Sequence, residues 1–163
     1  MLEVIAEGDR LVVARDGERI PLERLADQNR FAARHPKFDR FAFAFGRKDP
    51  EKADSPVVEM SWGGDWYRNA AYDGPESFDY PKAWDSYAGH YRNESPWIGS
   101  LRIFVLKGRL MLDGTIPLEG EGDLFRLRDN PYNTEWIRFG ELVNGRCMRI
   151  RLSGSDLWRV AAA

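Results

Sequence analysis

Cysteine and histidine are almost missing from this sequence of 163 residues. Cys147 is the single cysteine, and His35 and His90 are the only histidines. One cysteine excludes an intramolecular disulfide and a zinc site built from several thiolates. The two histidines lack the close spacing of metal-ligand motifs. We therefore predict no metal and no cofactor, and we interpret Cys147 as a structural thiol.

An excess of positive charge and long apolar runs are missing as well. The net charge is −2 and the sequence pI is about 5.8, which argues against the basic stripe of a nucleic-acid-binding protein. No window approaches the ~20 apolar residues of a membrane-spanning helix. Residues 1–8 have neither the basic start nor the apolar centre of a signal peptide. We expect a cytoplasmic bacterial protein without nucleic-acid or membrane partners.

The sequence also lacks the usual catalytic motifs. No serine is followed by lysine three residues later, and no Gly-x-Ser-x-Gly elbow occurs. Asp65 and Asp156 each stand in a Gly-x-Asp turn, where an aspartate bonds the nearby backbone without any catalytic role. The acidic loop 119–123 lacks the spaced ligands of a calcium loop. We assign no catalytic residue and expect no catalytic activity in this chain.

Short alternating runs separated by turn residues fill the sequence. Asp16-Gly17 and Asp113-Gly114 stand between such runs, and this dipeptide favours the primed turns of β-hairpins. In residues 41–45 phenylalanine occupies every second position, which is the period of a strand. No stretch of useful length has a helical period. These patterns predict an all-β, antiparallel sandwich or barrel.

Two halves of the sequence repeat each other at a spacing of roughly 95 residues, the scale of a small domain. The tetrapeptide Ile-Pro-Leu-Glu occurs at both 20–23 and 116–119. Further matches keep the same order: Arg10-Leu11 with Arg109-Leu110, Phe31 with Phe125, Phe43 with Phe139, and 63–68 with 154–159. The series predicts a tandem duplication.

The duplication suggests module boundaries. We predict a first β-module over 1–71, a linker over 72–85 and a second module over 86–163. The second module has an opening strand at 87–92 that the first lacks, so either that strand is dispensable or the chain was cut from a longer protein. Two small barrels are the preferred architecture, and one larger barrel that pools all strands is the alternative.

Aromatic side chains, which make up 13% of the residues, are the main candidates for a binding surface. Filling of the barrel interiors is the simpler explanation for most of them. Trp84 and Trp97 are the best candidates for an exposed docking surface, because aromatics are enriched in interfaces. The full candidate set for a ligand or partner surface is Trp62, Trp66, Trp84, Tyr87, His90, Tyr91 and Trp97.

Several segments resemble a known type of domain. They are 87–93, 96–102, 108–110, 124–127 and 152–160, with 61–67 and 72–80 before them. These segments are similar to the C-terminal, lipocalin-like β-barrel domains of serine hydrolases of the β-lactamase and D-aminopeptidase superfamily. The resemblance covers nearly the whole chain, and its motifs are turns and core aromatics.

The resemblance implies an accessory role. In that family the catalytic residues lie on a separate N-terminal domain, which nothing here matches. The expected partner is therefore a catalytic serine-hydrolase domain in cis, on which this region packs or whose cleft it gates; homo-oligomerisation stays open. A free-standing lipocalin-like carrier of a small hydrophobic ligand is the main alternative, and a small barrel enzyme is another.

Overall fold

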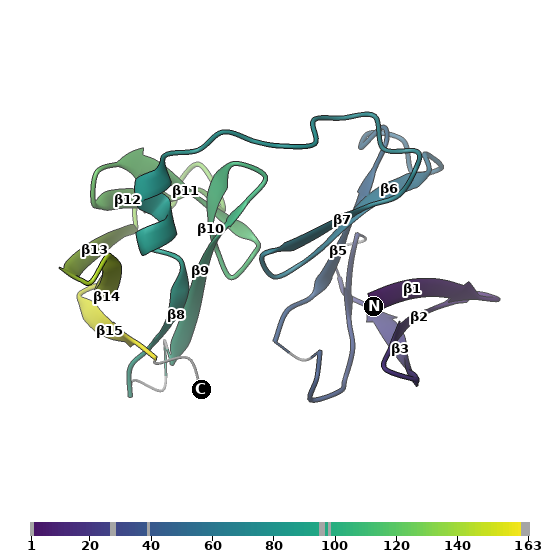
Figure 1. The fold of residues 1–163 in the computed structure, drawn as a ribbon, viewed down its shortest axis with the longest axis horizontal. Helices are drawn as coiled ribbons and strands as arrows, with labels where there is room; N and C mark the ends of the chain where they lie inside the picture. The colour runs from purple at the N-terminus through teal and green to yellow at the C-terminus, as the bar shows by residue number, and fades with distance from the viewer. Residues whose placement is uncertain (1, 27–28, 39, 95–96, 98, 161–163) are drawn as a thin grey trace. The chain divides into compact units, whose positions relative to one another are not determined.

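The computed structural model describes residues 2–26, 29–38, 40–94, 97 and 99–160 (Figure 1). The chain divides into two compact units, Met1–Gly74 (unit 1) and Pro75–Ala163 (unit 2). Each is built from antiparallel strands, and the one helical element described is a single short 3-10 turn. The prediction of an all-β, antiparallel protein is confirmed.

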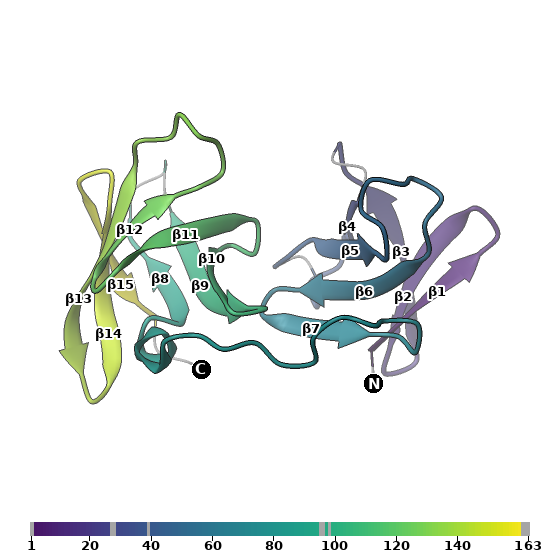
Figure 2. The same ribbon diagram turned by 90° about the horizontal axis from the view of Figure 1, so that it is seen from above.

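Unit 1 contains a curled sheet of seven strands whose spatial order is the same as their order in the chain (Figure 2). Consecutive strands pair antiparallel throughout. The strands are β1 (Leu2–Glu7), β2 (Arg10–Arg15), β3 (Glu18–Arg24), β4 (Arg30–Ala32), β5 (Phe43–Arg47), β6 (Val57–Trp62) and β7 (Asp65–Arg68).

Unit 2 is a closed barrel of eight strands preceded by a 3-10 turn, η1 (Lys82–Ser86). The first strand, β8, closes the barrel because it pairs with both β9 and β15. The strands are β8 (Gly89–Arg92), β9 (Ser100–Leu106), β10 (Arg109–Leu112), β11 (Ile116–Glu121), β12 (Leu124–Leu127), β13 (Trp136–Val143), β14 (Arg146–Leu152) and β15 (Ser155–Arg159).

Tight turns explain why each unit makes its own sheet. The turn residues Asp16 and Gly17 both have positive φ, 53° and 82°, as a two-residue primed turn requires. Ser153 and Gly154 repeat this geometry before β15, with φ of 50° and 78°. Such turns pair each strand with its neighbour in the chain. The described strands accordingly form two separate sheets, which confirms two modules over one pooled barrel.

The strand registers show which parts of the two units are equivalent. Strands β1–β7 correspond in order to β9–β15. Ile20 faces Val13 as Ile116 faces Leu112, so the repeated Ile-Pro-Leu-Glu tetrapeptides occupy the same place. The paired registers also superpose Phe31 on Phe125, each buried in the core of its unit. The predicted duplication therefore extends to the pairing of individual residues.

Two of the sequence matches are shifted in the structure. Phe31 pairs with Phe43, whereas Phe125 pairs with Ile137, so the equivalent of Phe43 is Ile137 and not Phe139. The last hairpins close on Trp62↔Asp65 and on Leu152↔Ser155. Asp65 is therefore equivalent to Ser155 and not to Asp156. The two residue matches predicted from sequence similarity are therefore wrong. The register of the last hairpin is set by its two-residue turn and not by the aspartates.

The barrel of unit 2 has a densely filled interior. Inward side chains from all around the barrel are fully buried, with aromatic rings in mutual contact: the Phe125 and Phe139 rings are 5.6 Å apart and edge-on. The members without exposed surface are Tyr91, Leu110, Phe125, Ile137, Cys147, Ile150 and Leu157. Side chains thus fill this small barrel, as packing in an eight-stranded barrel predicts.

A glycine in β11 is required by a close backbone approach. A Cβ atom at Gly120 would overlap the carbonyl oxygen of Leu124 and lie 2.7 Å from the Cα of Phe125. We expect Gly120→Ala to lower the free energy of unfolding of unit 2 by ~1–3 kcal/mol, the usual cost of overpacking. Gly140→Ala is the matched control, since its Cβ would meet nothing closer than 3.6 Å. Urea unfolding of both variants tests this, and equal losses would contradict it.

Candidate partner-binding face of unit 2

Two of the sequence-predicted surface residues belong to the barrel core. Tyr91 is completely buried, and Tyr87 stacks on Phe139 with a centroid distance of 4.1 Å. The Tyr87 hydroxyl donates to the Gly122 carbonyl oxygen at 2.8 Å. Burial raises the pKa of both tyrosines above the usual value. These side chains hold β8 and η1 to the barrel, so neither contributes to an outer surface.

The other predicted residues of unit 2 have mixed surroundings. Trp84 lies on η1, half-buried against the edge of Phe125 at 6.0 Å. It borders a cavity of about 260 Å³ beside β10 and β11. His90 lies in β8 and is half-buried. Trp97 is 94% exposed, in a connection whose residues Pro96 and Ile98 lie outside the described part of the chain.

Trp62 and Trp66 belong to unit 1. The Trp62 ring stacks on Phe43, and its Nε1 donates to the Phe41 carbonyl oxygen at 3.1 Å. Trp66 donates to Glu59 Oε2 at 2.8 Å. Each indole is therefore tied into the local packing of unit 1. Of the predicted residues in unit 2, Tyr87 and Tyr91 belong to the core, whereas Trp97 is exposed.

The outer side of β13, β14 and β15 presents a different cluster, which we call the Trp158 face. Its members are Trp136, Arg149, Arg151, Asp156 and Trp158. The two indoles are 47% and 50% exposed. Cross-strand pairing sets Arg149 opposite Trp158 and Arg151 opposite Asp156. The Arg149 guanidinium lies 5.9 Å from the centre of the Trp158 ring, a cation–π distance.

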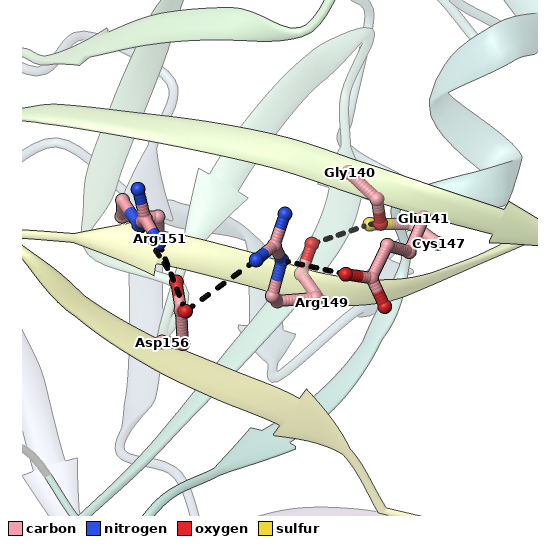
Figure 3. A network of polar contacts seen from close by, with 6 residues as sticks. All are labelled: Gly140, Glu141, Cys147, Arg149, Arg151 and Asp156. Carbon is pink, nitrogen blue, oxygen red and sulfur yellow. Dashed lines mark hydrogen bonds and ion pairs between the residues drawn. The ribbon is translucent and has the colours of Figure 1, made fainter.

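Ion pairs fix the arginines of the Trp158 face in place (Figure 3). Arg151 binds both carboxylate oxygens of Asp156, at 2.8 and 3.0 Å. Arg149 bridges the same carboxylate, at 3.4 Å, and Glu141, at 3.2 Å. The hydrogen bonds from Arg151 hold the pKa of Asp156 below its ordinary value and raise that of Arg151. Two guanidiniums are thus preorganised beside an exposed indole.

Cys147 supports this region from inside the barrel. Its thiol is fully buried and lies 3.2 Å from the Gly140 carbonyl oxygen and 3.1 Å from that of Arg149. Figure 3 shows it on the strand that carries Arg149 and Arg151. A buried thiol that contacts backbone carbonyls packs as a small apolar group. The arrangement agrees with a structural role for this residue.

The Asp156 carboxylate gives the Trp158 face a pH dependence. A carboxyl whose pKa is lowered on folding stabilises the folded state above its unfolded-state pKa, near 3.8, and loses this contribution as pH falls through the lower folded-state value. We expect Asp156→Asn to flatten the loss of unit 2 stability below pH 4. Urea unfolding between pH 2.5 and 7, in roughly half-unit steps, measures it. An unchanged acid limb would contradict the assignment.

The Trp158 face is rich in tryptophan and arginine. Tryptophan and arginine dominate binding hot spots because they combine large contact area with directed hydrogen bonds. Within the described residues, no cluster of three or more metal-ligating side chains occurs. The single helical turn described, η1, is five residues long and far too short to cross a bilayer. Comparison of the chain with family models, with curated proteins and with solved structures gives no match.

Sequence reasoning missed the Trp158 face for a local reason. Leu157 and Trp158 are adjacent and both apolar, and only the register of β15 shows that Leu157 points inward and Trp158 outward. The signal that was present is the alternation of β14, where Arg149 and Arg151 flank the buried Ile150. Two arginines on the outward side of that strand mark the face on which its neighbours carry Trp158 and Asp156.

Proposed function

We propose that the chain is a non-catalytic accessory β-barrel region that binds the catalytic domain of a β-lactamase-like serine hydrolase through the Trp158 face. The observation that carries the binding role is the half-exposed Trp158 beside two arginines held by Asp156. The choice of partner rests on the resemblance of the barrel motifs to the lipocalin-like domains of such hydrolases. The filled interior of unit 2 favours a scaffold over a container.

The identity of the partner domain and the role of the Trp158 face are tested separately. Sequencing the genomic DNA that flanks the coding region should reveal a domain with a Ser-x-x-Lys motif. That domain, purified and titrated with the chain by calorimetry, should bind it, and Trp158→Ala should weaken binding by roughly 30-fold or more, as at a hot spot. Tyr132→Ala, on a residue that is 89% exposed, is the control and should leave the affinity unchanged.

Two results contradict the proposal. A flanking region without a serine-hydrolase domain removes the predicted partner. A hydrolase domain that binds wild type and Trp158→Ala equally well removes the Trp158 face as its site.

A free-standing carrier of a small hydrophobic ligand is the second candidate. Two cavities in unit 1, of about 180 and 290 Å³ with partly apolar walls, favour it. Both lie at or below the lower end of the 300–1,000 Å³ of typical ligand sites, which is why we rank it second. Titration with a hydrophobic fluorescent dye decides: saturable, stoichiometric quenching of tryptophan emission supports the carrier, and its absence rules the carrier out.

A further inference from the structure

The sheet of unit 1 ends at two edges, β1 and β7. Each of these strands has one neighbour among the described strands, β2 and β6 respectively. β1 turns Leu2 and Val4 toward the core of unit 1, and β7 does the same with Tyr67. An edge strand offers a row of backbone donors and acceptors that can pair with a further strand.

In unit 2 the corresponding place is occupied. β9 and β15 are the equivalents of β1 and β7, and β8 lies between them, antiparallel to both. β8 brings Tyr91 into the core, where it is completely buried. No described strand of unit 1 is the counterpart of β8. Unit 1 is therefore an eight-stranded barrel short of one strand.

Exposure at equivalent positions shows the effect of the missing strand. The last hairpins make Val57 the equivalent of Cys147, since each stands five residues before the strand residue at the turn, Trp62 or Leu152. Cys147 is completely buried, whereas Val57 is 39% exposed. Val4 is half-buried, while its equivalent Ile103 is 2% exposed. The apolar side chains on both sides of the gap are thus less covered than their counterparts.

A hydrogen bond confirms that the two places correspond. In unit 2 the Arg159 side chain donates to the Cys147 carbonyl oxygen at 2.6 Å. In unit 1 the equivalent residue, Asn69, donates to the Val57 carbonyl oxygen at 2.8 Å. Arg159 goes on to bind the segment that closes the barrel, through the Ser86 and Ala88 carbonyl oxygens.

The gap in unit 1 is also a cavity. A space of about 180 Å³ is lined by both edges, with Leu2 and Val4 from β1, Tyr67 and Arg68 from β7, and Asn69 directly after β7. Its remaining walls come from β5 and β6: Phe45, Val57, Val58, Glu59 and Met60. The lining is mostly apolar, which suits the inward side of an added strand.

We propose that unit 1 binds an extended segment of a partner polypeptide, which inserts between β1 and β7 as an eighth strand and closes the barrel. This is strand addition to open sheet edges, in which backbone hydrogen bonds give affinity and alternate side chains give specificity. The inference concerns unit 1 alone and does not depend on a hydrolase partner.

The internal repeat specifies the chemistry of the inserted strand. Like β8, it runs antiparallel to both neighbours and carries a large aromatic residue between polar residues. That aromatic residue points inward over Val57. A second copy of this chain is a poor donor, because its β8 is held by the buried Tyr91 and by the Arg159 hydrogen bonds. A second copy is therefore not the occupant that we propose.

A peptide with the sequence of residues 86–94, which includes β8, is the probe, and the full chain is the receptor. We expect saturable binding by calorimetry, together with slower hydrogen exchange in β1 and β7. A peptide in which the tyrosine corresponding to Tyr91 is replaced by serine should bind at least 10-fold more weakly. In the receptor, Val57→Asp should abolish binding, and Val143→Asp, at an exposed position of unit 2, should not.

Folding of each variant is checked by the hydrogen exchange of β2 and β3, and Val57→Thr replaces Val57→Asp if that variant unfolds. Absence of saturable binding up to roughly 1 mM peptide, which corresponds to about −4 kcal/mol, overturns the proposal. So does protection confined to β9 and β15, which would mean exchange with β8 of unit 2. Concentration-dependent dimers that protect β1 and β7 without peptide would replace the partner by a second copy.

Discussion

Arg159→Ala is expected to destabilise unit 2 more than any other single change to a polar residue. Its guanidinium donates to the carbonyl oxygens of Cys147, Ala88 and Ser86 and to the Tyr91 hydroxyl, at 2.6 to 2.8 Å. It therefore joins β15 to β14 and to the segment that contains β8. A hydrogen bond to a charged group contributes about 1.5–3 kcal/mol, and bonds that share one side chain are not additive. We therefore expect a loss of ~3–5 kcal/mol, as when one partner of a buried polar network is removed.

The effect should be confined to unit 2. Hydrogen exchange followed by mass spectrometry reports β8 and β15 separately from β1–β7, so unit 1 serves as an internal reference. Arg138→Ala is the matched control. The Arg138 side chain is 60% exposed, and its ion pair with Asp123 is long, at 3.9 Å. That surface pair should contribute at most about 1 kcal/mol. Similar exchange in both variants would contradict the role of Arg159.

Phe125→Ala is expected to have a comparable effect through packing. Phe125 is completely buried, and its ring contacts those of Trp84, Tyr87 and Phe139 at centroid distances of 5.6 to 6.1 Å. Removal leaves a cavity at the centre of the aromatic cluster, which should cost ~3–5 kcal/mol. Loosening of Trp84 should also shift the tryptophan emission to longer wavelength.

Tyr132→Ala is the control for Phe125→Ala, since it removes an aromatic ring that is 89% exposed. A surface change of this kind should alter the free energy of unfolding by about 0.5 kcal/mol or less. Urea unfolding followed by near-ultraviolet circular dichroism compares the two variants. Losses of similar size would mean that the aromatic cluster does not hold the barrel together.

Much of the fold could be predicted from local patterns. Asp-Gly turns and period-two runs identified the hairpins, and the repeated Ile-Pro-Leu-Glu identified the equivalent strands β3 and β11. The later registers could not be predicted from the sequence. Residue similarity aligned Phe43 with Phe139, whereas the strand pairing makes Ile137 the equivalent of Phe43. A one- or two-residue shift leaves composition unchanged and alters which residues face each other.

The candidate sites were harder to predict, because they depend on closure. The sequence showed that the first repeat begins one strand late, but not that the resulting edges line one cavity with Val57 in its wall. Likewise, the hydrophobic pattern of the sequence did not identify Tyr91 as a core residue. That assignment follows from β8 lying between β9 and β15, which are far apart in the sequence.

Residue-resolved amide hydrogen exchange of the two edges tests the central claim most directly, namely that unit 1 is a barrel short of one strand. The amides of β1 that point away from β2 should exchange at least ~100-fold faster than their equivalents in β9, which β8 protects. The same contrast should hold between β7 and β15. Equal protection of β1 and β9 in the isolated chain would show that the sheet of unit 1 is already closed and would contradict the account.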